Sequence, residues 1–261
     1  MSMPPQPDPW LRNAIRGASP AGLRVAVAIG RRAWRDSALG GARLRLASRL
    51  PVRPQSDFPC CVTEVVQEIR KSAFFEGKLA NIKLGAKRLD GVVVAPGEVL
   101  SFWKLVARPT AAGGFEIGRS IRGGAAGADI GGGLCQLSGI TYEAGLRAGL
   151  QVVERHPHSR DLYAEEERFT PLGLDATVVW PYKDLRLRNS LPVPVQFRIE
   201  VEGMWVRASV HAAVPAEPTA VDVERVDSDE WREVRVVRRA ASGQAELISH
   251  DLYAAPQRAL P

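Results

Sequence analysis

The sequence has few of the features that mark membrane-spanning proteins. Its longest uninterrupted apolar run, residues 25–30, is followed at once by two arginines, whereas a transmembrane helix needs roughly 20 apolar residues. We therefore expect no membrane-spanning segment. A cleavable signal peptide is not expected either, because Arg12, Arg16 and Arg24 interrupt the apolar stretch that it would need.

Cysteine is scarce as well. The chain has three cysteines, of which Cys60 and Cys61 are adjacent, so it offers a poor disulfide framework. Without a secretion signal this favours a reducing compartment. We expect a cytoplasmic protein, or one peripheral to the inner face of the membrane. The hydrophobic share of 45% and the charged share of 25% indicate a globular chain rather than a disordered one.

Acidic residues are almost missing from one stretch. Between Trp10 and Arg53 there are ten arginines, no lysine and one acid, Asp36, which leaves 25 basic and 28 acidic residues for the rest. The pattern predicts a basic surface-binding arm and no specific nucleic acid partner. Three interpretations of the arm stay open: a solvated helix face packed on the body, a contact with an anionic membrane surface, and a contact with nucleic acid.

Three parts are predicted along the chain. Residues 1–59 form the Arg-rich helical N-terminal arm and a linker, residues 60–215 an α+β core, and residues 216–261 a C-terminal extension. Helical spacing of apolar residues occurs over residues 62–69 and 79–89. The expected fold class is α+β, with helices packed on a mostly antiparallel sheet.

Strand patterns are expected in the same core. Residues 92–95 and 99–103 are predicted to form a hairpin around a Pro-Gly turn, and residues 193–201 and 206–210 a second hairpin. Weaker strand signals follow at residues 233–237. These patterns favour antiparallel pairing rather than a regular alternation of strands and helices.

A glycine-rich turn precedes the third cysteine. Gly131, Gly132 and Gly133 allow unusual backbone angles and close approach. Helical spacing starts directly after them, so Cys135 is predicted in the first turn of a helix, where free N–H groups favour a thiolate. The small residues 138–139 would leave room for another element near the sulfur. The apolar stripe of this helix consists of Leu137, Ile140, Ala144 and Ala148.

A short strand after this helix leads to two histidines. With a period of two, Glu154, His156 and His158 would point to one side, and Pro157 favours an extended His156. A helix-borne thiol followed by a strand-borne imidazole is what a Cys-His nucleophile pair requires. A carboxylate behind the histidine would fix its tautomer. The candidates are Asp161, Asp175 and Asp184.

Other interpretations of these residues stay open. Cys135 can be a buried core residue under a tight glycine turn. A metal site with Cys135, His156 and His158 would lack a nearby fourth Cys or His ligand, and we expect no metal and no cofactor. The glycines do not form a phosphate loop, because no Gly-Lys-Ser/Thr follows them.

A charged strand is predicted near residue 186. It would place Asp184, Arg186 and Arg188 on one face, and it would bury Leu185 and Leu187 on the other. We expect the charged face to be solvated, with an anionic ligand as the alternative.

The sequence resembles the VanW family over roughly residues 60–200. The family is named for an accessory protein of vancomycin-resistance clusters. The paired motifs Gly-Gly-Gly-Leu-Cys-Gln and Glu-Arg-His-Pro-His-Ser are the most specific part of the match. The matching segments are residues 81–84 (NIKL), 89–91 (LDG), 96–98 (PGE), 101–106 (SFWKLV), 131–138 (GGGLCQLS), 154–159 (ERHPHS), 176–178 (ATV) and 184–189 (DLRLRN).

The resemblance implies a link to the bacterial cell envelope and glycopeptide resistance, but no defined reaction. The implied partner is a cell-envelope peptide or a peptidoglycan precursor. Some relatives have Asp and others Gly at the position of Asp175, which favours Asp184 as the carboxylate. The order of a Cys-bearing helix and a His-bearing strand is also similar to transglutaminase-like and papain-like cysteine enzymes.

Two hypotheses follow from the sequence. The first is a Cys135/His158 site for acyl or amide chemistry on an envelope peptide, with His156 as the alternative base and Asp184 or Asp175 as the carboxylate. The second is a non-catalytic binding or scaffold domain in which Cys135 is a structural thiol. The candidate binding residues are Gly131, Gly132, Gly133, Gln136, Ser138, Glu154, Arg155, Ser159, Arg186 and Arg188.

Overall fold

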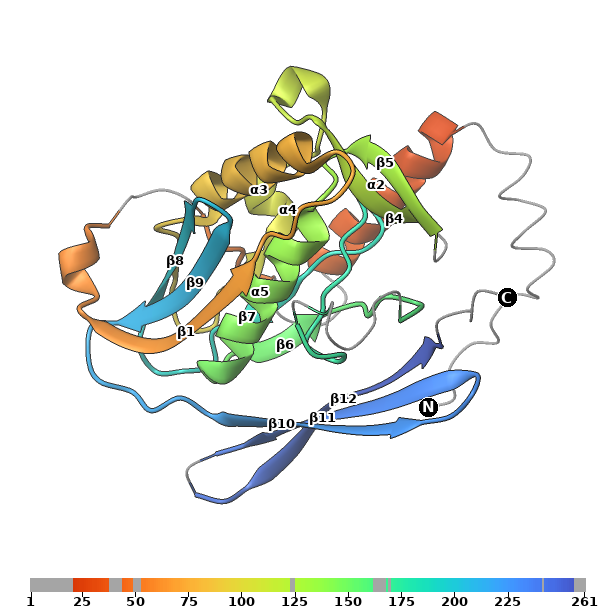
Figure 1. Cartoon of the computed structure of the whole chain (residues 1–261). Helices are drawn as coiled ribbons and strands as arrows, with labels where there is room; N and C mark the ends of the chain where they lie inside the picture. The colour runs from red at the N-terminus through yellow and green to blue at the C-terminus, as the bar shows by residue number, and fades with distance from the viewer. Residues whose placement is uncertain are drawn as a thin grey trace. The chain divides into compact units, whose positions relative to one another are not determined.

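The computed structural model describes residues 21–37, 44–48, 53–122, 125–161, 168, 170–240 and 242–255. In these ranges it has four α-helices and twelve strands in antiparallel sheets, so the protein is mixed α+β and mostly strand, as the sequence predicted (Figure 1). The chain divides into two compact units, residues 1–44 and 45–261. The predicted boundaries after residues 59 and 215 stay predictions.

The first unit contributes one described helix, α2 (Ala21–Ser37), which lies in the predicted N-terminal arm. The other residues of this unit that precede residue 44 lie outside the described part. No helix among the described residues is long and apolar enough to cross a membrane.

The largest sheet has the strand order β1-β9-β8-β2. It consists of β1 (Cys60–Glu68), β9 (Trp205–Ala212), β8 (Val195–Glu202) and β2 (Val93–Val94). Strands β8 and β9 form the predicted hairpin, with Gly203 at φ 57° in the turn. Burial alternates near the β8–β9 turn, where Val206 is buried between the exposed Trp205 and Arg207, but residues 208–212 of β9 are all buried, so both faces are covered there.

Two local predictions were wrong. Residues 62–69, predicted as helix, form most of β1, because their β-branched side chains pair along the whole length of β9. Residues 92–95 and 99–103 do not pair with each other. Strand β2 pairs with β8, and β3 (Val99–Ser101) pairs with β7 (Arg186–Arg188) of another sheet. For both β2 and β3, pairing with a strand distant in the sequence outweighs the local Pro-Gly turn signal.

Three helices cover and fill the body. Helix α3 (Phe75–Leu89) packs on β8, α4 (Phe102–Val106) follows β3, and α5 (Leu134–Arg147) packs on β1 and β9. The predicted stripe on the Cys-bearing helix is buried: Leu137 and Ile140 have no exposed surface. Helix α5 is thus a core element, so its first turn is held rigidly by packing.

Smaller sheets complete the second unit. Strand β7 lies between β3 and β6 (Gln151–Glu154), and β4 (Ile117–Arg122) pairs with β5 (Ala125–Ile130) ahead of α5. Within β7 and just before it, Leu187 and Leu185 are fully buried, as predicted.

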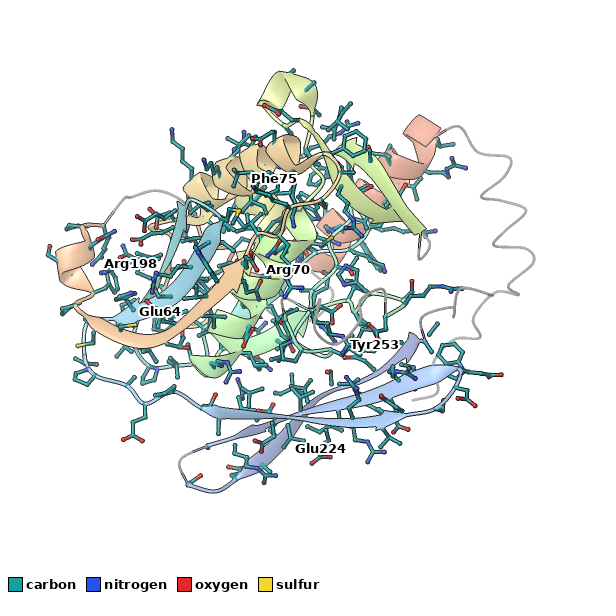
Figure 2. The ribbon with its side chains drawn as sticks, in the orientation of Figure 1. Glu64, Arg70, Phe75, Arg198, Glu224 and Tyr253 are labelled. Atoms are coloured by element: carbon teal, nitrogen blue, oxygen red, sulfur yellow. The ribbon has the colours of Figure 1, made fainter. Side chains whose placement is uncertain are left out.

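The C-terminal sheet consists of β10 (Ala220–Asp227), β11 (Trp231–Arg239) and β12 (Ala245–Ala254). It lies across one side of the body, and its residues Val236 and Tyr253 are fully buried (Figures 1 and 2). The sheet therefore shares the core of the second unit.

Candidate thiol site

Two glycines, Gly132 and Gly133, determine where α5 begins. A Cβ atom on Gly132 would lie 2.1 Å from the carbonyl oxygen of Gly118 in β4, so no larger residue fits there. Gly133 has φ 100°, a backbone angle that favours glycine, and it is the residue before the helix. Cys135 is consequently the second residue of α5, in its first turn.

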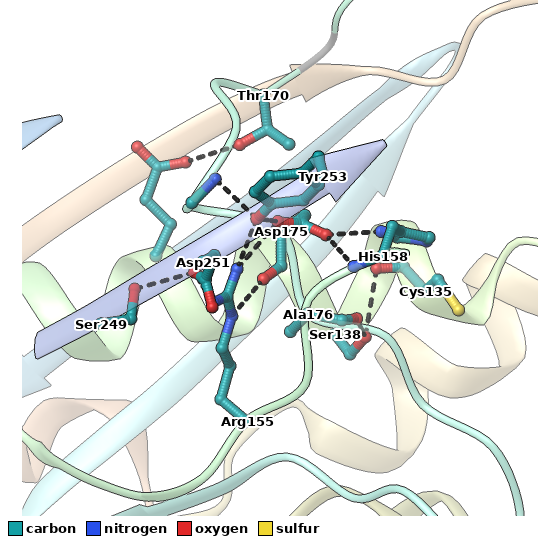
Figure 3. A network of polar contacts seen from close by, with 12 residues as sticks. Cys135, Ser138, Arg155, His158, Thr170, Asp175, Ala176, Ser249, Asp251 and Tyr253 are labelled. Carbon is teal, nitrogen blue, oxygen red and sulfur yellow. Dashed lines mark hydrogen bonds and ion pairs between the residues drawn. The ribbon is translucent and has the colours of Figure 1, made fainter. Parts of the chain in front are cut away.

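The Cys135 thiol is half-buried and has two neighbours. Its sulfur lies 3.7 Å from the carbonyl oxygen of Val178. Its side chain also acts on the imidazole of His158, whose pKa it helps to raise. Figure 3 shows Cys135 and His158 in the network at the start of the helix.

Asp175 binds His158 from the other side. His158 Nδ1 lies 2.5 Å from Asp175 Oδ2, and the same oxygen accepts a bond of 2.7 Å from the His158 backbone N–H. The contact of Nδ1 with the carboxylate leaves Nε2 as the ring nitrogen available to the thiol. The order is therefore thiol, imidazole, carboxylate.

The second oxygen of Asp175 is also saturated. Arg155 Nη2 donates to Asp175 Oδ1 at 2.8 Å, and the Tyr253 hydroxyl donates to the same atom at 2.6 Å. Arg155 Nε further donates to the Asp175 carbonyl oxygen at 2.7 Å and Nη1 pairs with Asp251. These residues, Arg155, His158, Asp175, Asp251 and Tyr253, are called the Asp175 cluster below.

The charges of this cluster support one another. Burial disfavours the imidazolium, but the bonds and charges of Asp175 and Cys135 outweigh it and raise the pKa of His158 to about 10. Burial also opposes ionisation of Asp175, yet the bond from His158 and the charge of Arg155 hold the pKa of that carboxyl well below its usual range. At neutral pH the pair is imidazolium and carboxylate.

Sequence reasoning missed Tyr253 and Asp251. Both come from β12, in the segment that we predicted as a C-terminal extension and in which we named no site residue. The Tyr253 hydroxyl also accepts a bond of 2.9 Å from the backbone N–H of Gly173. The strand signal was weak, and no local pattern links residue 253 to residue 175, so only the tertiary fold reveals this contact.

The space beside the thiol is filled by an element that the sequence did not indicate. Residues 174–178 cross α5 where its residues are small. A Cβ on Gly139 would lie 3.6 Å from the backbone nitrogen of Ala176, and Ser138 Oγ donates to the Ala176 carbonyl at 2.5 Å. This crossing brings Asp175 and Val178 to the helix.

Asp184, the carboxylate favoured from the sequence, lies elsewhere. Its oxygens accept bonds from Ser101 Oγ at 2.7 Å, from the Trp103 backbone N–H at 3.0 Å and from Arg186 Nε at 3.1 Å. Burial, against these bonds, raises the pKa of Asp184. The structure thus brings Asp175 to His158 and places Asp184 at the start of α4.

His156 belongs with Asp184 and not with His158. Its Nε2 lies 3.1 Å from Glu154 Oε1, and the same oxygen accepts a bond of 2.9 Å from the Asp184 backbone N–H. Arg186 lies 3.5 Å from the other oxygen of Glu154. These residues, Ser101, Glu154, His156, Asp184 and Arg186, are called the Asp184 cluster.

The predicted charged face at residue 186 is not solvated. Asp184 and Arg186 are 1% and 6% exposed, and they contact each other, Glu154 and the start of α4. A buried ion pair replaces the expected hydrated face. Arg188, further along β7, is half-buried between its strand neighbours.

The remaining predicted residues have structural contacts. Gln136 Nε2 donates to the Glu68 carbonyl of β1 at 2.8 Å. Ser159 is exposed, and its carbonyl accepts a bond from the backbone of Ala254. Asp161 pairs with Arg168. In the described ranges, no group of three or more His, Cys, Asp or Glu side chains is arranged to hold a metal ion.

Comparison with known proteins agrees with the sequence motifs. The family profile described as "VanW like protein" matches residues 77–211, more than half of the chain. The chain belongs to the VanW-like family. The matched range contains Cys135, His158 and Asp175, whereas Tyr253 and Asp251 lie beyond it.

Two relatives illustrate the range of the family. The chain is 37% identical over 123 residues to "Uncharacterized protein YoaR" of Bacillus subtilis (strain 168), covering 47% of this chain and 39% of that protein. It is 30% identical over 137 residues to "Vancomycin B-type resistance protein VanW" of Enterococcus faecalis (strain ATCC 700802 / V583), covering 52% and 50%. The chain thus spans half or less of the length of these relatives. No solved structure matches it.

Proposed function

We propose that Cys135 is the nucleophile of a site for acyl or amide chemistry, with His158 as its acid-base partner and Asp175 as the carboxylate that orients the imidazole. The observation that carries this proposal is the continuous order of the three groups. Asp175 Oδ2 lies 2.5 Å from Nδ1 of His158, the Cys135 side chain contributes to the raised pKa of that imidazole, and the thiol is half-buried rather than sealed.

The proposed reaction needs no group beyond the substrate and water. In the reacting state the proton of Cys135 already lies on Nε2 of His158, so the thiolate sulfur forms a bond to the carbonyl carbon of an amide. The C–N bond breaks, and the imidazolium returns the proton to the leaving amine. Water or a second amine then attacks the thioester and releases Cys135. Asp175 stays ionised throughout and stabilises the imidazolium.

The proposed substrate is a peptide of the bacterial cell envelope or its precursor. The support is the printed name of the Enterococcus faecalis relative, a vancomycin resistance protein, together with membership of the same family. The proposed location is the cytoplasm or the inner face of the membrane, where peptide precursors could meet a thiol kept reduced.

A second function is favoured by one contact. The Cys135 sulfur faces the carbonyl oxygen of Val178 at 3.7 Å, and neighbouring Ser138 ties Ala176 to the same helix. In a scaffold or binding domain, these contacts alone would account for the cysteine: it would hold residues 174–178 on α5 and would not react.

Thiol alkylation separates the two functions. Folded protein is treated with iodoacetamide at neutral pH, and each cysteine is read by mass spectrometry. Cys61 is the internal reference because it is more exposed than Cys135, while desolvation and the charge of Glu64 raise its pKa. If Cys135 reacts faster than Cys61, and also faster in the folded protein than in the denatured protein, an activated thiol is supported. Protection of Cys135 until unfolding establishes the scaffold.

An acyl-trapping experiment tests the chemistry. The protein is incubated with a mixture of cell-wall muropeptides and quenched in acid, and the mass of the Cys135 peptide is measured. A thioester adduct that hydroxylamine removes is expected, and Cys135→Ser and His158→Gln should abolish it. A reactive thiol that forms no adduct would retain the nucleophile and refute this substrate class.

A further inference from the structure

Helix α2 leaves large apolar side chains in solvent. Leu23, Val27, Ile29 and Trp34 are 55%, 44%, 44% and 61% exposed. Four such residues on one helix of 17 residues are unusual for a soluble protein, in which a helix normally buries its apolar face. The exposure calls for a partner that covers this helix.

The arginines of α2 occupy a separate face. At about 100° per residue, Arg24, Arg31 and Arg32 fall within an arc of about 100°. The exposed apolar residues lie on the remaining arc, where Leu23 and Trp34 lie within about 20° of each other. The helix is therefore divided lengthwise into a cationic face and a wide apolar face.

The dimensions of α2 exclude a spanning orientation. Seventeen residues make a helix of about 25 Å, shorter than the hydrocarbon core of about 30 Å, and it carries several arginines. A helix with a wide apolar face and a cationic face is instead suited to lie in the plane of a membrane interface.

Charge decides between the partners that could cover α2. Nucleic acid could contact the arginines but would leave the Leu23 and Trp34 side chains in water. A second copy of α2 would cover the apolar face but bring two cationic faces together, and only one acid, Asp36, lies between residues 10 and 53 to offset them. An anionic bilayer offers headgroups for arginine and an apolar layer for Trp34, a residue enriched at such interfaces.

We propose that α2 docks this protein on an anionic phospholipid surface, with Leu23, Val27 and Trp34 inserted below the headgroups and Arg24 and Arg31 in contact with phosphates. This inference is independent of the reaction at Cys135. It would bring the protein to the membrane, where lipid-linked or membrane-bound peptides are concentrated.

Vesicle flotation of the full-length protein tests the proposal. The protein should float with vesicles of phosphatidylcholine and phosphatidylglycerol, but not with phosphatidylcholine alone. The bound fraction should fall sharply in about 1 M NaCl, where the screening length drops to about 3 Å. Binding that is equal on neutral vesicles, or absent on anionic ones, overturns the proposal.

Two variants test the two faces separately. Arg24→Glu with Arg31→Glu should weaken vesicle binding at least about tenfold, because each basic residue near the surface contributes about 1 kcal/mol. Leu23→Ser with Trp34→Ser should also release the protein. The matched control is Lys83→Glu with Lys87→Glu, the same charge change on exposed positions of α3, which should bind as the wild type does. If the control and the charge variant bind vesicles equally, the assignment of the binding site to α2 is wrong.

Competing partners give distinct results. Binding of duplex DNA that outcompetes the vesicles identifies a nucleic acid arm and overturns the proposal. A dimer in sedimentation experiments that Leu23→Ser with Trp34→Ser dissociates identifies self-association and also overturns it. Thermal unfolding of each variant shows that the second unit is intact, so loss of vesicle binding reports on α2 alone.

Discussion

Two clusters of the same residue types lie on either side of the loop after β6, and they differ in charge. The Asp175 cluster sets Asp175 and Asp251 against Arg155 and His158, and the contacts with Arg155 and His158 keep Asp175 ionised. The Asp184 cluster sets Asp184 and Glu154 around one arginine, and burial raises the pKa of Asp184. An aspartate thus stabilises an imidazolium in one cluster, whereas in the other cluster an aspartate accepts hydrogen bonds at the start of α4.

This difference indicates which histidine can act as the acid-base partner of Cys135. His158 is held by a carboxylate and its pKa is raised in part by Cys135, whereas His156 contacts Glu154 of the Asp184 cluster. We therefore expect substitutions in the Asp184 cluster to change stability, and those in the Asp175 cluster to change the reactivity of Cys135.

The largest expected effect is a loss of folding stability caused by a substitution next to the Asp184 cluster. Leu185→Asp places an unpaired charge at a fully buried position beside Asp184 and should cost more than about 4 kcal/mol. Urea unfolding measures the loss, and Leu185→Met is the control of similar volume, expected to cost less than about 1.5 kcal/mol. A native-like transition for Leu185→Asp would show that residue 185 is not in the core.

The next effect separates the clusters by reactivity. Asp175→Asn removes the charge that sustains the imidazolium, so alkylation of Cys135 at pH 7 should slow by about tenfold or more. Asp184→Asn is the matched change in the other cluster and should leave the rate within about twofold. Equal slowing in both variants, with both folded, would mean that the two clusters are not distinct.

The pH dependence of stability should follow His158. Its folded pKa of about 10 exceeds the unfolded value of about 6.5, so its stabilisation is complete below pH 6.5 and is lost as the pH rises through 10. The stability difference between wild type and His158→Gln should therefore shrink from pH 7 to pH 10. Urea unfolding at several pH values measures it. His156→Gln serves as the control, and a difference that grows with pH contradicts the cluster charges.

The smallest effect concerns Tyr253. Tyr253→Phe removes one of four hydrogen bonds to the Asp175 carboxylate, so alkylation of Cys135 should slow only about two- to fivefold and its pH profile should shift. The exposed Tyr182→Phe is the control. If Tyr253→Phe alters stability but leaves the pH profile in place, the C-terminal sheet supports the fold and not the site.

The elements with strong local patterns were predictable. The β8–β9 hairpin has strict alternation and a glycine turn, and the α5 stripe has regular helical spacing after three glycines. Residues 62–69 failed because the spacing of their three valines and one isoleucine matches a helix, whereas pairing with β9, with a register shift between Cys61 and Thr63, makes them a strand. The predicted hairpin of residues 92–95 and 99–103 was wrong because a turn signal does not determine which strand each flanking segment pairs with.

The candidate site was predictable in part for the same reason. Cys135 and His158 lie in compact motifs, so their types and order could be read from the chain. The expected alternation of residues 154, 156 and 158 ends with β6, and His158 turns to the side of Arg155 instead. A loop has no period, so side-chain direction beyond Glu154 could not be derived.

The sequence by itself determined the family, the α+β class, the cysteine at a helix start and the separation of a cationic arm from a near-neutral body. These depend on motifs and on spacing within short segments. Only the tertiary structure decided that Asp175 rather than Asp184 meets His158, and that Tyr253 reaches Asp175. Residues 158, 175 and 253 are brought together by the packing of α5 and the C-terminal sheet. Contacts made across such distances in the chain depend on the whole core, and no local pattern records them.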